Sequence, residues 1–132
     1  MDSATSELVR RRAGERCEYC RLPQQASALR FHVEHIVARQ HGGGDDLENL
    51  ALACPECNYQ KGTNLSGVDP DTGKVTTLFH PRRDLWPAHF ARDSARITGR
   101  TPVGRTTVWL LEMNIGDRLR WREMLLRLGL LE

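Results

Sequence analysis

The sequence predicts an α+β fold: a ββα unit held together by a four-cysteine metal site, followed by a small α/β extension. Two C-x-x-C pairs, Cys17/Cys20 and Cys54/Cys57, bracket the unit. Between them, apolar and polar residues alternate over residues 29–34, as in a half-buried strand. Pro55 follows a second apolar stretch and suits the first position of a helix. Strand, loop, strand and helix in this order make the ββα unit.

Length and composition fit one compact domain. The chain has 132 residues, and we expect residues 1–66 to form the core unit and residues 67–132 to pack on it. There is no apolar run long enough to cross a membrane and no secretory signal in residues 1–16, so we expect a cytoplasmic protein. The net charge of +2 is too small to indicate a nucleic-acid partner by itself.

Local patterns predict the elements of the first half. Leu8, Val9 and Ala13 form the apolar side of a short helix that Gly14 ends. In chain order we expect a helix at 6–14, a cysteine knuckle at 17–20, a strand at 29–37, a glycine-rich turn at 41–46, a strand at 47–53 and a helix at 55–61.

The second half has weaker signals. Thr101 and Pro102 are a good N-cap and first residue of a helix that runs to about Met113. Before it we expect a turn at 68–73, a weak strand at 74–79, a loop at 80–84, a short aromatic segment at 86–90 and a strand at 96–100. A last amphipathic helix covers roughly residues 116–128. It directs four leucines (119, 125, 126, 128) inward and four arginines (118, 120, 122, 127) mostly outward.

The four cysteines predict a structural zinc site. Each C-x-x-C pair lets two sulfurs reach one ion from a single turn, and zinc prefers tetrahedral thiolate coordination. Paired cysteines in a reducing compartment are more often metal ligands than disulfides. Four protein ligands leave no open position, so we expect this metal to stabilise the fold.

A polar cluster lies between the cysteine pairs. Glu34 can hold a hard divalent ion such as Mg²⁺ or Mn²⁺, and the amide oxygen of Asn58 can complete that site. His35 can take a proton from water because its ordinary pKa lies near neutral pH. Asn49 can tie down the loop and position His35. These parts suit hydrolysis of a phosphodiester.

This segment resembles the HNH endonucleases, a branch of the ββα-metal (His-Me finger) nucleases. The matching stretches are 17–20, 33–37, 41–50 and 54–62. The resemblance implies that His35 is the general base, that Asn49 positions it, and that Glu34 and Asn58 bind the catalytic metal. Glu34 stands where many members have aspartate.

The extension resembles, more loosely, a segment of stand-alone bacterial members around residues 78–82 and 101–105. Its polar and aromatic residues either contact nucleic acid or form a loop that caps the core. The candidate nucleic-acid contacts are His32, Lys61, Arg82 and Arg83.

We therefore expect a metal-dependent endodeoxyribonuclease that acts on double-stranded DNA. The resemblance implies products with 5′-phosphate and 3′-hydroxyl ends. Neither a membrane nor a small-molecule substrate is expected. Two alternatives stay open: a non-catalytic zinc module that binds nucleic acid or protein, and a nuclease toxin domain that needs an immunity partner.

Overall fold

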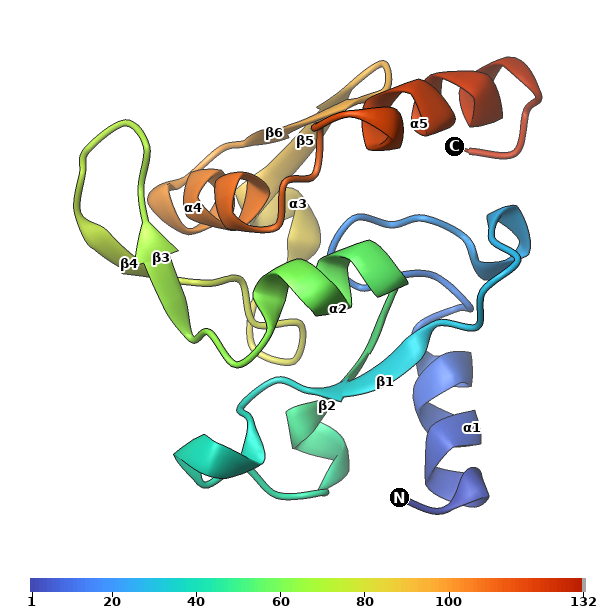
Figure 1. The fold of residues 1–132 in the computed structure, drawn as a ribbon, viewed down its shortest axis with the longest axis vertical. Coiled ribbons are helices and arrows are strands. Elements are labelled where there is room, and N and C mark those ends of the chain that lie inside the picture. The colour runs from blue at the N-terminus through green and yellow to red at the C-terminus, as the bar shows by residue number, and fades with distance from the viewer. Residues whose placement is uncertain (132) are drawn as a thin grey trace.

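The computed structural model describes residues 1–131. Figure 1 shows the first half of the chain, blue to green, in the lower part of the molecule and the second half, yellow to red, in the upper part. Helix α2 (Pro55–Lys61) lies between them. None of the helices among the described residues is long and apolar enough to cross a membrane.

The ββα unit forms as predicted, with shorter strands. Strand β1 (His32–His35) pairs antiparallel with β2 (Leu50–Ala53), in a register that puts His35 opposite Leu50. Residues 47–49, expected in the second strand, instead form a 3₁₀ turn that leads into β2. All four residues of β2 are buried, because both α2 and α1 (Ser3–Arg12) contact the β1–β2 pair.

The N-terminal helix begins three residues earlier than predicted. The side chain of Asp2 accepts a hydrogen bond from the Thr5 amide at 2.7 Å and caps the helix. Gly14 adopts a left-handed conformation (φ +66°) just beyond the helix end, as its position predicts.

The extension contains two hairpins and three helices. Strands β3 (Ser66–Val68) and β4 (Val75–Thr77) form one hairpin, and β5 (Phe90–Asp93) and β6 (Arg96–Gly99) form the other. The expected strand at 96–100 is β6, whereas β3 and β5 had no recognisable strand pattern. Helix α3 (Trp86–His89) is one turn within the expected aromatic segment.

Helix α4 (Pro102–Leu110) has the predicted cap: Thr101 Oγ1 accepts from the Gly104 amide at 3.0 Å. Gly104 is required there, since a Cβ atom would lie 2.0 Å from the carbonyl oxygen of His89. The close approach brings α4 against the β5–β6 hairpin and its connection.

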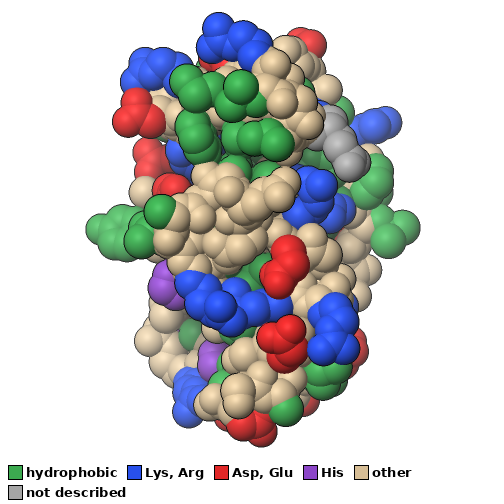
Figure 2. Space-filling view, turned by 90° about the vertical axis from the view of Figure 1, so that its right-hand side faces the viewer, with side chains coloured by type: hydrophobic (Ala, Val, Ile, Leu, Met, Phe, Trp, Pro, Cys, Tyr) green, Lys and Arg blue, Asp and Glu red, His purple; other side chains and the backbone are tan. Residues whose placement is uncertain are grey.

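The prediction for the last helix, α5 (Asp117–Arg127), was partly wrong. Leu125 is buried, but Leu128 is 62% exposed, and Arg122 is only 2% exposed. The Arg122 guanidinium donates to the carbonyl oxygens of Ala95 and Met113. These buried carbonyl oxygens need a hydrogen-bond donor, and Arg122 supplies it from the inward face of the helix. Leu128 lies on the outward face instead. In Figure 2 hydrophobic side chains gather at the upper end, where Figure 1 places α5.

One hydrophobic core includes residues from both halves of the chain. Val9, Leu50 and Leu52 from the first half belong to the same buried cluster as Phe79 and Leu111 from the second. Rings extend this contact: Tyr19 and Phe79 meet edge to face, with centroids 6.3 Å apart.

Candidate functional site

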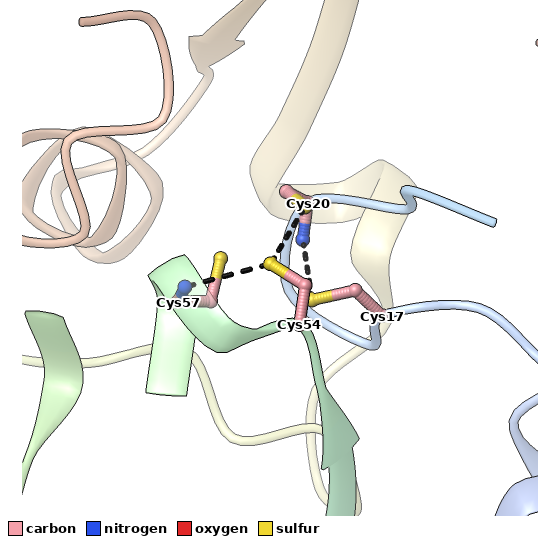
Figure 3. Close-up of side chains that lie close together, drawn as sticks. All are labelled: Cys17, Cys20, Cys54 and Cys57. Carbon is pink, nitrogen blue, oxygen red and sulfur yellow. Dashed lines mark hydrogen bonds between the residues drawn. The ribbon is translucent and has the colours of Figure 1, made fainter. Parts of the chain in front are cut away.

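The four cysteines converge between the knuckle and the start of α2. Cys17 and Cys20 come from the knuckle, Cys54 precedes α2 and Cys57 lies in its first turn (Figure 3). All four are buried and unbridged, and their Sγ atoms lie within 4.8 Å of one another. A tetrahedral ion with Zn–S bonds of about 2.3 Å needs sulfurs roughly 3.8 Å apart. The Sγ atoms of Cys20 and Cys54 are 3.7 Å apart. The residues therefore fit a closed, structural zinc site.

An arginine from α5 lies beside this cysteine cluster. Nη2 of Arg118 donates to Sγ of Cys57 at 3.0 Å and lies 3.8 Å from Sγ of Cys54. Four thiolates around a zinc dication carry a net charge of −2, which a neighbouring guanidinium offsets through charge-assisted hydrogen bonds. The sequence pattern had directed Arg118 outward, because a helix pattern carries no information about a metal beside it.

His35 lies at the end of β1 and makes a hydrogen bond with Asp45. Its Nε2 is 2.7 Å from Oδ1 of Asp45, and 21% of its side chain is exposed. Nη2 of Arg39 contacts both carboxylate oxygens of Asp45, at 2.9 and 3.2 Å. The hydrogen bond with His35 is the main cause that lowers the pKa of Asp45. An ionised carboxylate can only accept, so Nε2 is the donor, and in a neutral ring Nδ1 then keeps its lone pair.

Asn49 holds the loop that lies between His35 and Asp45 in the sequence. Its Oδ1 accepts from the Val37 amide at 2.9 Å, and its Nδ2 donates to the carbonyl oxygens of Val37 and Gly44 at 2.9 and 2.8 Å. Gly43 is packed so tightly that a Cβ atom would lie 1.7 Å from the Val37 oxygen. Asn49 thus joins the segment after His35 to the segment before Asp45.

Glu34 points the other way, into the protein. It is 7% exposed, its Oε1 accepts from the Tyr19 hydroxyl at 2.8 Å, and its Oε2 lies 3.3 Å from Nζ of Lys61. Burial raises the pKa of Glu34, and the nearby Lys61 ammonium opposes that rise. Each carboxylate oxygen retains a lone pair beyond these contacts.

Lys61 is engaged inside the protein. It is 3% exposed, and Nζ donates to the carbonyl oxygens of Ile36 and His35, at 2.9 and 3.4 Å. Asn58, one turn earlier on α2, is half-buried, and its side-chain amide is free of hydrogen bonds to the described part of the chain. The structure therefore places Glu34 and Lys61 in direct contact and leaves Asn58 available to a ligand.

The other candidate contacts differ in exposure. Arg82 forms an ion pair with Glu18, and both side chains are 10% exposed, so its charge is engaged in the interior. His32 and Arg83 are exposed. Figure 2 shows basic side chains gathered across the middle of one face, next to acidic ones, so that this face is not uniformly positive.

Comparison with known proteins identifies the core. Residues 17–64 match the model of the HNH endonuclease family. This segment is an HNH domain. It contains all four cysteines and the polar residues from Glu34 to Asn58, and a nuclease-type function follows from the family in general terms.

One curated relative also matches beyond the HNH domain. The chain is 27% identical over 116 residues to the Septu protein PtuB of Bacillus thuringiensis. The match covers 86% of this chain and 42% of the relative, so the chain spans less than half the length of that protein. No solved structure matches the chain significantly.

Sequence reasoning missed the residues that support the HNH motif. Tyr19 contacts Glu34 and Asp45 contacts His35 directly, and Arg39 contacts Asp45. Asp45 had one signal, as an acidic residue directly after a glycine run near a histidine. Tyr19 and Arg39 had none, because only the folded chain brings them to their partners.

Proposed function

We propose that this protein is a metal-dependent endonuclease that hydrolyses phosphodiester bonds of DNA, with His35 as general base. The observation that carries the proposal is the hydrogen bond between the His35 ring and Asp45 within an HNH domain. Nε2 lies 2.7 Å from a carboxylate oxygen that can accept its proton, so in a neutral ring Nδ1 is the nitrogen with the free lone pair. A partly exposed imidazole in this state can accept a proton from water.

The reaction follows from the chemistry of these groups. Nδ1 of His35 accepts a proton from a water molecule while the water oxygen attacks phosphorus. The bond from phosphorus to the 3′-oxygen breaks, that oxygen takes a proton from solvent water, and His35 returns its proton to solvent. The products carry 5′-phosphate and 3′-hydroxyl ends.

Glu34 and Asn58 are the residues we propose to hold Mg²⁺ or Mn²⁺. A bound cation would stabilise the negative charge on the phosphate and on the leaving oxygen. Asn58 has an amide oxygen free for this role. Glu34 would bind with the lone pairs that Tyr19 and Lys61 leave, and those two contacts would orient the carboxylate as outer partners of a ligand do.

DNA contacts are proposed for His32 and Arg83, which are exposed. For Lys61 and Arg82 the interior contacts argue for an indirect role, in which they fix the elements that carry the site. A cytoplasmic location is consistent with four cysteines that would hold zinc in a reducing environment.

The proposal is tested by plasmid cleavage. Zinc-loaded wild type, His35→Ala and His41→Ala proteins are incubated with supercoiled plasmid and Mg²⁺ or Mn²⁺, with EDTA as a control. His41 is an exposed histidine of the same loop, whose ring contacts the carbonyl oxygen of Thr63. We expect metal-dependent nicking by the wild type and by His41→Ala, and at least a hundredfold loss in His35→Ala.

Two outcomes would contradict the proposal. Cleavage by His35→Ala at the wild-type rate would remove His35 as the base. DNA binding without cleavage by any variant would favour the non-catalytic zinc module.

A further inference from the structure

We propose that Asp45 is a positioning residue for the nuclease reaction, which fixes the orientation and the tautomer of His35. The inference deepens the proposed function and rests on it. Asp45 lies outside the set of base, metal ligands and asparagine named above. Its role follows from the contacts of one loop.

The loop between β1 and β2 is shaped to deliver this carboxylate. The carbonyl oxygen of Ala38 accepts from the amides of His41 and Gly43, at 2.9 and 3.0 Å. Gly42 adopts a left-handed conformation (φ +89°), which other residues rarely adopt. Gly43 allows the loop to approach Val37 closely, and Asn49 then secures both sides. The chain reverses within a few residues and returns Asp45 to the His35 ring.

Asp45 is held from two sides although it is exposed to solvent. His35 donates to Oδ1 at 2.7 Å, and Arg39 contacts both oxygens. The Arg39 contacts limit the rotation of the carboxylate and keep one oxygen on the ring. Half of the Asp45 side chain and two thirds of the Arg39 side chain are exposed, whereas only 21% of the His35 side chain is exposed.

The bond has a chemical consequence for His35. A neutral imidazole carries its proton on either nitrogen, and only the nitrogen without the proton can serve as the base. A carboxylate at Nε2 favours the Nε2–H tautomer of the neutral ring, which leaves Nδ1 as the acceptor. It also holds the ring plane, since a rotated ring would lose the hydrogen bond. A carboxylate behind a histidine has the same effect in other hydrolases.

Asp45→Asn tests this role without removing the loop's size or shape. An amide can donate to Nε2 and so favour the opposite tautomer, in which Nδ1 carries the proton. We expect kcat to fall about 10–100-fold with little change in KM, as is typical when the partner of a working histidine is altered. Asp46→Asn is the matched control, because it makes the same charge change at the next position, which is also exposed.

A second measurement does not depend on activity. Nitrogen-15 NMR of the imidazole rings distinguishes the two tautomers, and we expect His35 to be Nε2–H in the wild type and in Asp46→Asn, with Nδ1–H appearing in Asp45→Asn. An Nδ1–H ring in the wild type would overturn the inference, whatever the protein does to DNA. Wild-type kcat in Asp45→Asn, in a protein shown to cleave DNA, would overturn it as well. If neither the wild type nor any variant cleaves DNA while NMR shows the expected tautomers, the proposed function fails. The effect of Asp45 on the tautomer of His35 is then still supported.

Discussion

At the scale of single residues, Glu34 and Lys61 depend on each other. Both are almost completely buried, and they form an ion pair with each other. Removing one partner of a buried ion pair leaves an uncompensated charge, which is more costly than replacing both. Lys61 also donates to two backbone carbonyls at the end of β1, so it supports the strand that carries His35.

Lys61→Met is therefore expected to lower the free energy of unfolding by about 3–5 kcal/mol. Lys74→Met is the control, because Lys74 is the other lysine of the chain and is exposed. Adding Glu34→Leu to Lys61→Met should restore part of the loss, since no charge then remains unpaired. Urea unfolding at a fixed zinc concentration measures the free energy of unfolding of the two single variants and of the double variant. Equal stability of Lys61→Met and Lys74→Met would contradict the dependence.

At the scale of secondary-structure elements, α5 takes part in the metal site. Arg118 is in its first turn and donates to Cys57, and its Nη1 also donates to the carbonyl oxygen of Leu111. Spacing predicted the knuckles, β1, β2 and α2, because each depends on residues close in sequence. It did not predict the direction of Arg118 or Arg122, because their partners are carbonyls and sulfurs brought by distant segments.

Arg118→Met should release zinc about 10–100 times faster than the wild type, as expected for loss of an outer partner of a metal site. Arg120→Met is the control on the same helix, where an exposed arginine contacts only Asp117 at the surface. Zinc transfer to a chromophoric chelator measures the rate. Equal rates in the two variants would show that the guanidinium does not stabilise the bound metal.

At the scale of the whole molecule, the HNH domain and the extension share one core. Phe79 and Leu111 pack in the same cluster as Leu50 and Leu52, and Trp86 Nε1 donates to the carbonyl oxygen of Tyr19 at 2.7 Å. A fragment of residues 1–66 would expose this surface and lose Arg118. We expect it to bind zinc without adopting the native fold, whereas the full chain gives a dispersed ¹H–¹⁵N spectrum. A folded fragment would show that the extension is dispensable.

The sequence was most informative where function is encoded locally. The cysteine pairs, His35, Asn49 and Asn58 are recognisable from residue type and spacing within the segment that matches the HNH family. The direction of Glu34 and the partner of His35 depend on packing, which brings Tyr19 to one and a folded loop to the other. The two strands β3 and β5 escaped prediction because they are short and sit in hairpins whose pairing partners define them.

The contact between Trp86 and the cysteine knuckle should make the intrinsic fluorescence of Trp86 sensitive to bound zinc. The Trp86 indole donates a hydrogen bond to the carbonyl oxygen of Tyr19, which lies between Cys17 and Cys20 in the sequence. The Arg21 guanidinium lies 5.2 Å from the centre of the indole ring. The other two tryptophans, Trp109 and Trp121, are 64% and 39% exposed. Loss of zinc should loosen the knuckle and shift the emission of Trp86 to longer wavelength, and Trp86→Phe should abolish most of that shift. Metal occupancy can thus be followed by intrinsic fluorescence, in unlabelled protein, while DNA cleavage is assayed in the same cuvette.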